Sequence, residues 1–80
     1  MMKIEVLGTG CMKCKRMYDN VNEAVKNSGI QAEIVKVDDL NEIISRDVLM
    51  TPALFVDGKE HIAGRVPTVN EIIEILKEGS

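Results

Sequence analysis

Two spacings of apolar residues alternate along the chain, one typical of strands and the other of helices. The alternating, β-branched segment from Met2 to Leu7 predicts a strand. From Cys11 to Ser28 the apolar residues recur every three or four positions and share one helical face, and Gly29 follows where a left-handed C-cap favours glycine. Ile30 to Val37 alternates only in part, which predicts a second strand covered on both faces.

A shorter helix is predicted in the middle of the chain. It begins after Asp38-Asp39, which offers an N-cap, and it ends at Thr51-Pro52 because the residue before a proline avoids the helical conformation. The apolar stripe of this helix consists of Leu40, Ile43, Ile44 and Val48.

A hairpin and a closing helix are predicted for the rest of the chain. Asp57-Gly58 is a strong two-residue hairpin signal between the strands Ala53 to Val56 and Lys59 to Ala63. By alternation with Lys59, His61 is expected to point to solvent from this edge strand. After a loop, the capping box from Thr68 to Glu71 opens a helix that is expected to end at Gly79.

The order of elements is therefore βαβαββα, which indicates the α/β class. Because helices join the first three strands, these strands are expected to be parallel with right-handed crossovers, and the hairpin adds an antiparallel edge. The sequence predicts one domain spanning residues 1–80, with a four-stranded mixed sheet flanked by helices on both faces.

Composition narrows the classes of function. Phe55 and Tyr18 are the aromatic residues of the 80, so the core is expected to be aliphatic. The net charge of −3 argues against nucleic-acid binding, which favours a basic face. No apolar run approaches the roughly 20 residues of a membrane span, and the N-terminal segment is too short for a signal peptide. We expect a cytoplasmic protein that is a monomer.

The candidate chemistry lies in Cys11 and Cys14, a Cys-x-x-Cys pair at the predicted start of a helix. Backbone N–H groups and the helix dipole favour a thiolate at this place. Cytoplasmic thiols stay reduced unless they are catalytic or hold metal, and the loop that this pair closes is too short for a useful structural cross-link. The pattern therefore indicates either a redox dithiol or a metal site.

Two segments carry a family resemblance. The first runs Gly8-Thr9-Gly10-Cys11-Met12-Lys13-Cys14, and the second runs Pro52-Ala53-Leu54-Phe55-Val56-Asp57-Gly58. Together with the order of elements, they resemble the thioredoxin/glutaredoxin superfamily, and more narrowly the small prokaryotic thioredoxin-like proteins described as redox-active disulfide proteins. The resemblance covers essentially the whole chain.

The resemblance implies a thiol-disulfide oxidoreductase that reduces protein disulfides, receives electrons from an unidentified reductase and needs no cofactor or metal. It implies that Cys11 is the nucleophile, that Cys14 is the resolving thiol, and that the two form a redox-active disulfide. It also implies a cis peptide bond before Pro52, which holds the Thr51 backbone extended beside Cys11 to pair with a substrate strand. The implied substrate-binding residues are Thr51, Pro52, Met12, Lys13 and Gly64.

The chain also departs from the family pattern. It lacks the Trp that precedes the first Cys of thioredoxins and the Gly-Pro between the two. The buried acid of strand two has no clear match, because Glu33 is expected to face solvent. Only Gly64 stands where glutaredoxins carry a glycine pair and an acidic pair, so glutathione use is not expected.

Two other functions remain open at this point. Heavy-metal-associated domains also place a Met-x-Cys-x-x-Cys motif at a helix start, and thiolates suit Cu(I) and Zn(II). The helical tail, Thr9 in place of Met, and an otherwise unexplained Pro52 oppose that alternative. The third possibility is an interaction module whose cysteines have no function.

Overall fold

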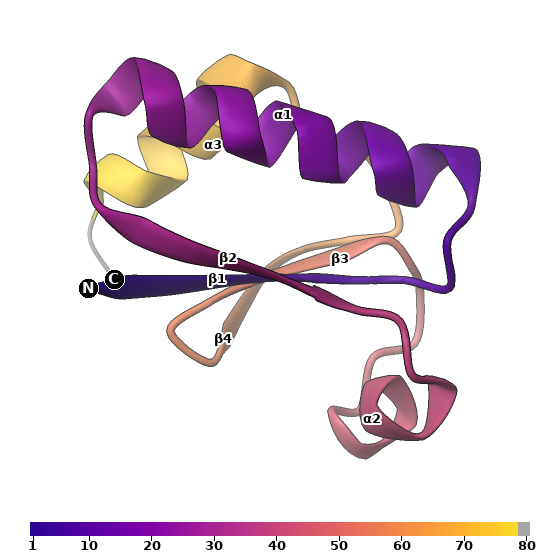
Figure 1. Cartoon of the computed structure of the whole chain (residues 1–80). Helices are drawn as coiled ribbons and strands as arrows, with labels where there is room; N and C mark the ends of the chain where they lie inside the picture. The colour runs from indigo at the N-terminus through magenta and orange to yellow at the C-terminus, as the bar shows by residue number, and fades with distance from the viewer. Residues whose placement is uncertain (79–80) are drawn as a thin grey trace.

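Along the part of the chain that the structure describes, seven elements follow one another in the predicted order (Figure 1). The computed structural model describes residues 1–78, so the predicted helix end at Gly79 lies outside the described residues. The elements are β1 (Met2–Leu7), α1 (Met12–Ser28), β2 (Ala32–Val37), α2 (Leu40–Ser45), β3 (Ala53–Val56), β4 (Lys59–Ala63) and α3 (Val69–Lys77).

The strands form one mixed sheet in the order β2-β1-β3-β4. β1 and β2 are parallel, and β3 and β4 form the predicted antiparallel hairpin. However, β1 and β3 are antiparallel, with Leu7 opposite Ala53 and Ile4 opposite Val56. The expectation that the first three strands are all parallel is therefore wrong.

The length of α2 explains the direction of β3. A six-residue helix rises about 9 Å, whereas a six-residue strand such as β1 spans roughly 20 Å. α2 thus cannot carry the chain back along the sheet, and it lies beyond the end of β2 (Figure 1). The chain enters β3 at the edge where β1 and β2 end, so β3 must run the opposite way.

Helices cover the two faces of the sheet unequally. α1 and α3 lie side by side over one face, and α2 lies on the other side near one end (Figure 1). The first core contains Ile4, Val6, Met17, Val21, Ala24, Leu54, Val56, Ile62, Ile72 and Leu76. The second contains Leu7, Val37, Ile43, Ala53 and Phe55. Among residues 1–78, the buried core side chains other than Phe55 are not aromatic, in agreement with the composition.

The helix ends are set by local chemistry. Cys11 is the N-cap of α1, Gly29 closes it with a φ of 72°, and Thr68 with Glu71 forms the predicted capping box of α3. α2 begins at its predicted cap, Asp39, but it ends at Ser45 and not at Thr51-Pro52.

The early end of α2 has a conformational cause. Asp47 adopts a φ of 58°, which takes the chain out of the helix before Val48 can join the apolar stripe. Leu40 and Ile44 are each 60% exposed, so the stripe buries mainly Ile43. The apolar residues of this stripe are therefore spaced as predicted, but they do not form a buried helix face.

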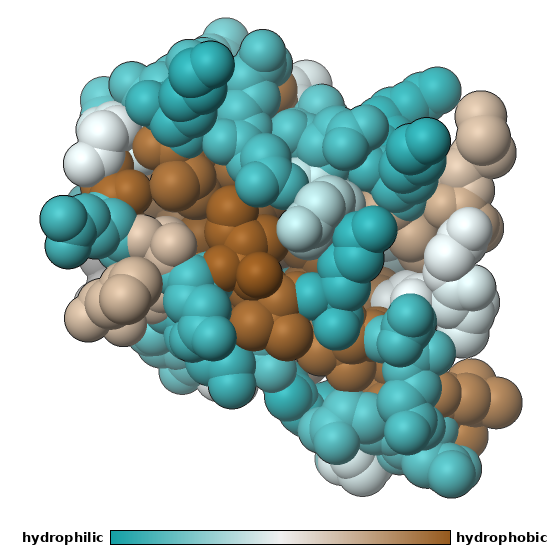
Figure 2. All heavy atoms as spheres, viewed as in Figure 1, coloured by the Kyte–Doolittle hydropathy of each residue, from teal (hydrophilic) through white to brown (hydrophobic). Residues whose placement is uncertain are grey.

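Two predictions about side-chain exposure are also wrong. β2 is an edge strand in which Val37 is buried and the other residues are half-buried or exposed, so it is not covered on both faces. Apolar atoms are accordingly visible between the helix layer and the sheet (Figure 2). His61 lies where the β3–β4 register shifts, is half-buried, and has an Nε2 with no hydrogen-bond partner among the described residues.

The helices are also short or polar. Within the described residues, no helix is both long enough and apolar enough to cross a membrane. The longest, α1, has 17 residues, and its outer face is charged.

Candidate active site

The two thiols meet at the first turn of α1. Their Sγ atoms lie 2.8 Å apart, and both cysteines are free. As the N-cap, Cys11 has an extended backbone, and its sulfur accepts a hydrogen bond from the backbone N–H of Cys14 at 3.4 Å. A three-residue spacing brings the sulfurs together because it corresponds to almost one helical turn.

Burial and charge distinguish the two thiols. Cys11 is exposed, whereas Cys14 is 6% exposed. The hydrogen bond from the Cys14 thiol, followed by the Cys14 backbone N–H, lowers the pKa of Cys11. Burial, followed by the hydrogen bond to Cys11, raises the pKa of Cys14. The exposed sulfur is therefore the one that ionises first.

The Thr51-Pro52 peptide bond is cis, as predicted. Pro52 is buried, and Thr51 is exposed at the surface. Gly8 lies close to both Cys14 and Pro52. A carbon placed at its Cβ position would lie 2.2 Å from Sγ of Cys14 and 3.9 Å from Cα of Pro52. The structure thus brings the dithiol and the proline together although they are far apart in the sequence.

Gly64 borders Pro52 on the other side. Its N–H donates a hydrogen bond to the Pro52 carbonyl at 2.9 Å. Its φ is +82°, and a Cβ there would lie 3.0–3.2 Å from the side chain of Met50. The backbone conformation favours glycine at this position, and a side chain there would also require Met50 to shift by a few tenths of an ångström.

Met12 and Lys13 lie between the cysteines on the exposed first turn of α1. Met12 is 78% exposed, and Lys13 is exposed. After the hydrogen bonds from Cys14, the backbone N–H of Lys13 is among the groups that lower the pKa of Cys11. Lys13 thus contributes to the lowered pKa of Cys11 through its backbone N–H at the start of α1.

The second strand of the sequence has no clear match for the buried acid of the family, but the structure has a buried acid in β1. Glu5 is 5% exposed, and its two carboxylate oxygens accept hydrogen bonds from both Nη atoms of Arg46. This hydrogen bonding lowers the pKa of Glu5 against the opposing effect of burial. Glu5 and Leu7 alternate with Ile4 and Val6, so Glu5 faces α2 and stays an ion-paired carboxylate away from Cys14.

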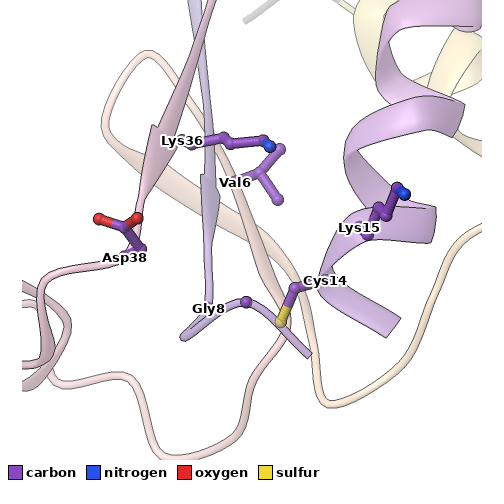
Figure 3. Close-up of a pocket in the computed structure, with 7 residues that line it drawn as sticks. Val6, Gly8, Cys14, Lys15, Lys36 and Asp38 are labelled. Atoms are coloured by element: carbon purple, nitrogen blue, oxygen red, sulfur yellow. The ribbon is translucent and has the colours of Figure 1, made fainter. Parts of the chain in front are cut away.

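A cavity of about 180 Å³ opens beside Cys14 (Figure 3). It is lined by Val6, Gly8, Gly10, Cys14, Lys15, Lys36 and Asp38. Lys36 extends past Val6 toward α1, where its Nζ lies 4.4 Å from the ring centroid of Tyr18, and the Asp38 carboxylate points away from Cys14 (Figure 3). The cavity therefore borders the otherwise buried Cys14.

The potential metal ligands in the described part of the chain do not cluster. Residues 1–78 contain no group of three or more His, Cys, Asp or Glu side chains that could hold a metal ion. Cys11 and Cys14 are the soft ligands on which the metal-carrier alternative depends.

Comparisons with known proteins identify the family. A family model described as a thioredoxin domain matches residues 2–77. Proteins named thioredoxin from Methanocaldococcus jannaschii and Methanothermobacter thermautotrophicus are 48% and 43% identical to this chain. These matches cover 96% and 95% of this chain, and 88% and 99% of the relatives. The chain belongs to the thioredoxin family.

A solved structure agrees with this assignment at the level of the fold. Thioredoxin-2, described as a component of malaria parasite protein secretion machinery, matches with a TM-score of 0.73 at 20% identity, over 98% of this chain and 82% of that one. The predicted family and fold are therefore confirmed. As a thioredoxin-family protein the chain is a thiol-disulfide oxidoreductase, and Cys11 and Cys14 fit its Cys-x-x-Cys motif. The family acts on protein disulfides together with a reductase.

Proposed function

We propose that Cys11 is the nucleophile and Cys14 the resolving thiol in the reduction of protein disulfides. The observation that carries this proposal is the contrast between an exposed sulfur of lowered pKa and a buried sulfur of raised pKa, 2.8 Å apart. The thiolate is the attacking species, so the exposed thiol that ionises first is the one suited to meet a substrate.

The reaction has two exchange steps. The Cys11 thiolate attacks one sulfur of a substrate disulfide, a mixed disulfide forms, and the other substrate sulfur leaves and takes up a proton. Cys14 then loses its proton and attacks Sγ of Cys11, which releases the second substrate thiol. The substrate gains two electrons and two protons, this protein is left with a Cys11–Cys14 disulfide, and a reductase returns the two electrons.

The hydrogen bond between the thiols couples these steps. While Cys11 is a thiolate, its negative charge and its hydrogen bond help to keep the pKa of Cys14 raised. Formation of the mixed disulfide removes that charge, so Cys14 ionises more readily than before. The resolving thiol thus becomes reactive after the first step, which protects the reduced protein from premature reaction of the buried sulfur.

The proposed substrate surface surrounds Cys11. Thr51 is exposed beside the buried Pro52, Gly64 contacts the Pro52 carbonyl, and Met12 is exposed next to Cys11. An exposed backbone next to a nucleophilic sulfur suits an extended peptide, because such a peptide can add hydrogen bonds to the chain that it meets. Thr51, Pro52, Met12, Lys13 and Gly64 are the residues proposed to contact substrate.

We also propose that the protein acts as a single domain and a monomer in the cytoplasm, without a further cofactor. One copy of the chain supplies both thiols, Pro52 and Gly64, which supports a monomer. A disulfide reductant needs a continuing supply of electrons, which a reducing compartment provides. Sedimentation of the reduced protein as a dimer would contradict the monomer.

Trapping of a mixed disulfide tests the assignment of roles. We expect Cys14→Ser to accumulate a covalent complex with a disulfide-bonded protein such as insulin, because the second step is blocked. We expect Cys11→Ser to form no complex and to lose disulfide reduction entirely. Thr9→Ala, an exposed change in the same loop, is the control and should reduce insulin at the unaltered rate. Full turnover by Cys14→Ser would refute the assignment.

Metal binding tests the alternative function. A soft-metal carrier would bind Cu(I) or Zn(II) tightly at one ion per protein and would not turn over disulfides. We expect the reduced protein to cycle between two titratable thiols and none as it reduces insulin. Tight stoichiometric metal binding without disulfide turnover would favour the carrier.

A further inference from the structure

Gly8 is a glycine for a different reason from its neighbour Gly10. Gly10 has a φ of +91° and open space around it, so its backbone conformation requires glycine. Gly8 is not among the positive-φ glycines of the described residues, and it is buried. A Cβ at Gly8 would lie 2.2 Å from Sγ and 3.1 Å from Cβ of Cys14. The space taken by the Cys14 sulfur is therefore the space of the missing side chain.

The two backbones that make this contact are both held in place. The N–H of Gly8 donates to the Val37 carbonyl at 3.0 Å, which ties the end of β1 to β2. Cys14 lies in the first turn of α1, where the N–H of Lys15 bonds to the Cys11 carbonyl at 3.0 Å. A side chain at position 8 could be accommodated most easily by rotation of the Cys14 side chain about χ1, which would move its sulfur away from Cys11.

We infer that Gly8 is a positioning residue for the resolving step: the absence of a side chain there holds Sγ of Cys14 in the rotamer that faces Sγ of Cys11. This inference rests on the proposed function, because it concerns the attack of Cys14 on the mixed disulfide. Reacting atoms must be close and aligned before attack, and a displacement of about 1 Å can slow a reaction about a hundredfold. A rotated sulfur would be displaced further.

A rotated Cys14 thiol would also cease to donate its hydrogen bond to Cys11. That hydrogen bond is the largest cause of the lowered pKa of Cys11. The pKa of Cys11 in Gly8→Ala should therefore rise toward that of an ordinary cysteine. If Gly8 had a purely structural role, Gly8→Ala would leave the pKa of Cys11 unchanged, so this pKa distinguishes the two roles.

The lifetime of the mixed disulfide tests the inference. Each reduced variant is mixed rapidly with a labelled disulfide peptide, quenched in acid and analysed by mass spectrometry. We expect Gly8→Ala to form the mixed disulfide on Cys11 and to resolve it about a hundredfold more slowly than the unaltered protein. Thr9→Ala should resolve it at the unaltered rate. Resolution by Gly8→Ala at the unaltered rate would overturn the inference.

A double-mutant cycle separates this role from a general loss of stability. Cys14→Ala removes the sulfur that a side chain at position 8 would meet, so Gly8→Ala should lower the midpoint of thermal unfolding less in that background than in the unaltered protein. This holds also if Gly8→Ala alone fails to fold, because Cys14→Ala should then restore folding. Equal destabilisation in both backgrounds would overturn the inference.

The two proposals fail in different ways. If no variant, including Cys14→Ser, forms a mixed disulfide on Cys11, the proposed nucleophile is wrong, and the resolving role of Gly8 is overturned with it. If the mixed disulfide forms on Cys11 but Gly8→Ala resolves it normally, the proposed function stands and only the inference about Gly8 is wrong.

Discussion

The helices α1 and α2 both follow a strand at the same edge of the sheet, yet they direct the chain differently. α1 has 17 residues and buries a continuous face against the sheet, and it returns the chain so that β2 runs parallel to β1. α2 has six residues and buries Ile43, and it leaves the chain at the edge where it began. α1 is therefore a crossover between parallel strands, whereas α2 is part of a connection that leads into an antiparallel strand.

This difference determines where the candidate active site lies. Because α2 does not return the chain, β3 starts opposite the end of β1, at Ala53 across from Leu7. Thr51-Pro52, which precedes β3, is thereby brought beside Gly8 and the start of α1, where the thiols lie. A parallel β3 would have begun at the far edge of the sheet and left Pro52 distant from Cys14.

The largest expected effect tests the unequal burial of the two helices. Met17 of α1 is fully buried, and its replacement by Ala should cost about 3 kcal/mol of unfolding free energy through lost contacts and a cavity. Ile44 of α2 is 60% exposed, and its replacement should change that free energy by about 0.5 kcal/mol or less. Urea unfolding measures both. Similar costs for the two changes would contradict the contrast.

The second test concerns what holds α2 to the sheet. Arg46→Met leaves the buried Glu5 carboxylate without its partner, and we expect a loss of about 2 kcal/mol, since Arg46 itself is partly exposed. Arg65→Met breaks a pair with Glu71 whose side chains are far more exposed, and it should leave the urea midpoint unchanged. Equal effects of the two changes would show that the Glu5–Arg46 pair does not anchor α2.

The same pair determines a pH dependence. The pKa of Glu5 is lowered by folding, so its contribution to stability is complete above its unfolded pKa and is lost as the pH falls through its folded pKa. The difference in unfolding free energy between the unaltered protein and Arg46→Met should therefore shrink as the solution is acidified. A difference that stayed constant down to the folded pKa would contradict this assignment.

The third test concerns the start of α1. The rate of Cys11 alkylation should rise with pH through a pKa below that of an ordinary cysteine. Cys14→Ala removes the thiol donor, so the curve should move to higher pH, whereas Cys14→Ser keeps a hydroxyl donor and should move it less. Coincident curves for the Ala and Ser variants would show that the hydrogen bond does not set the pKa of Cys11.

The smallest effect is expected at the loop that borders Pro52. Gly64→Ala places a side chain at a φ of +82° and against Met50, which should cost about 1 kcal/mol of unfolding free energy. Met50→Ala removes Cε and Sδ but keeps Cβ, so it should relieve only some of the steric cost and leave the backbone cost. No change in the urea midpoint for Gly64→Ala would show that the loop adapts freely.

Much of the local structure could be predicted because its causes are local. The three- and four-residue spacing along α1, the capping box at Thr68 and Glu71, and the Asp57-Gly58 hairpin each involve residues within a few positions of one another. The length of α2 was not predicted, because the spacing of apolar residues does not reveal that the chain turns out of the helix at Asp47. The same spacing does not reveal that Leu40 and Ile44 remain exposed.

By itself, the sequence determined the order of elements, the place of Cys11 and Cys14 at a helix start, and the family. Only the tertiary structure decided the direction of β3, the closeness of Pro52 and Gly8 to the thiols, and the pairing of Glu5 with Arg46. The physical reason is that these contacts join residues far apart in the chain. Whether such residues meet depends on the length of each connection and on the packing of each helix, because these determine where the chain returns to the sheet.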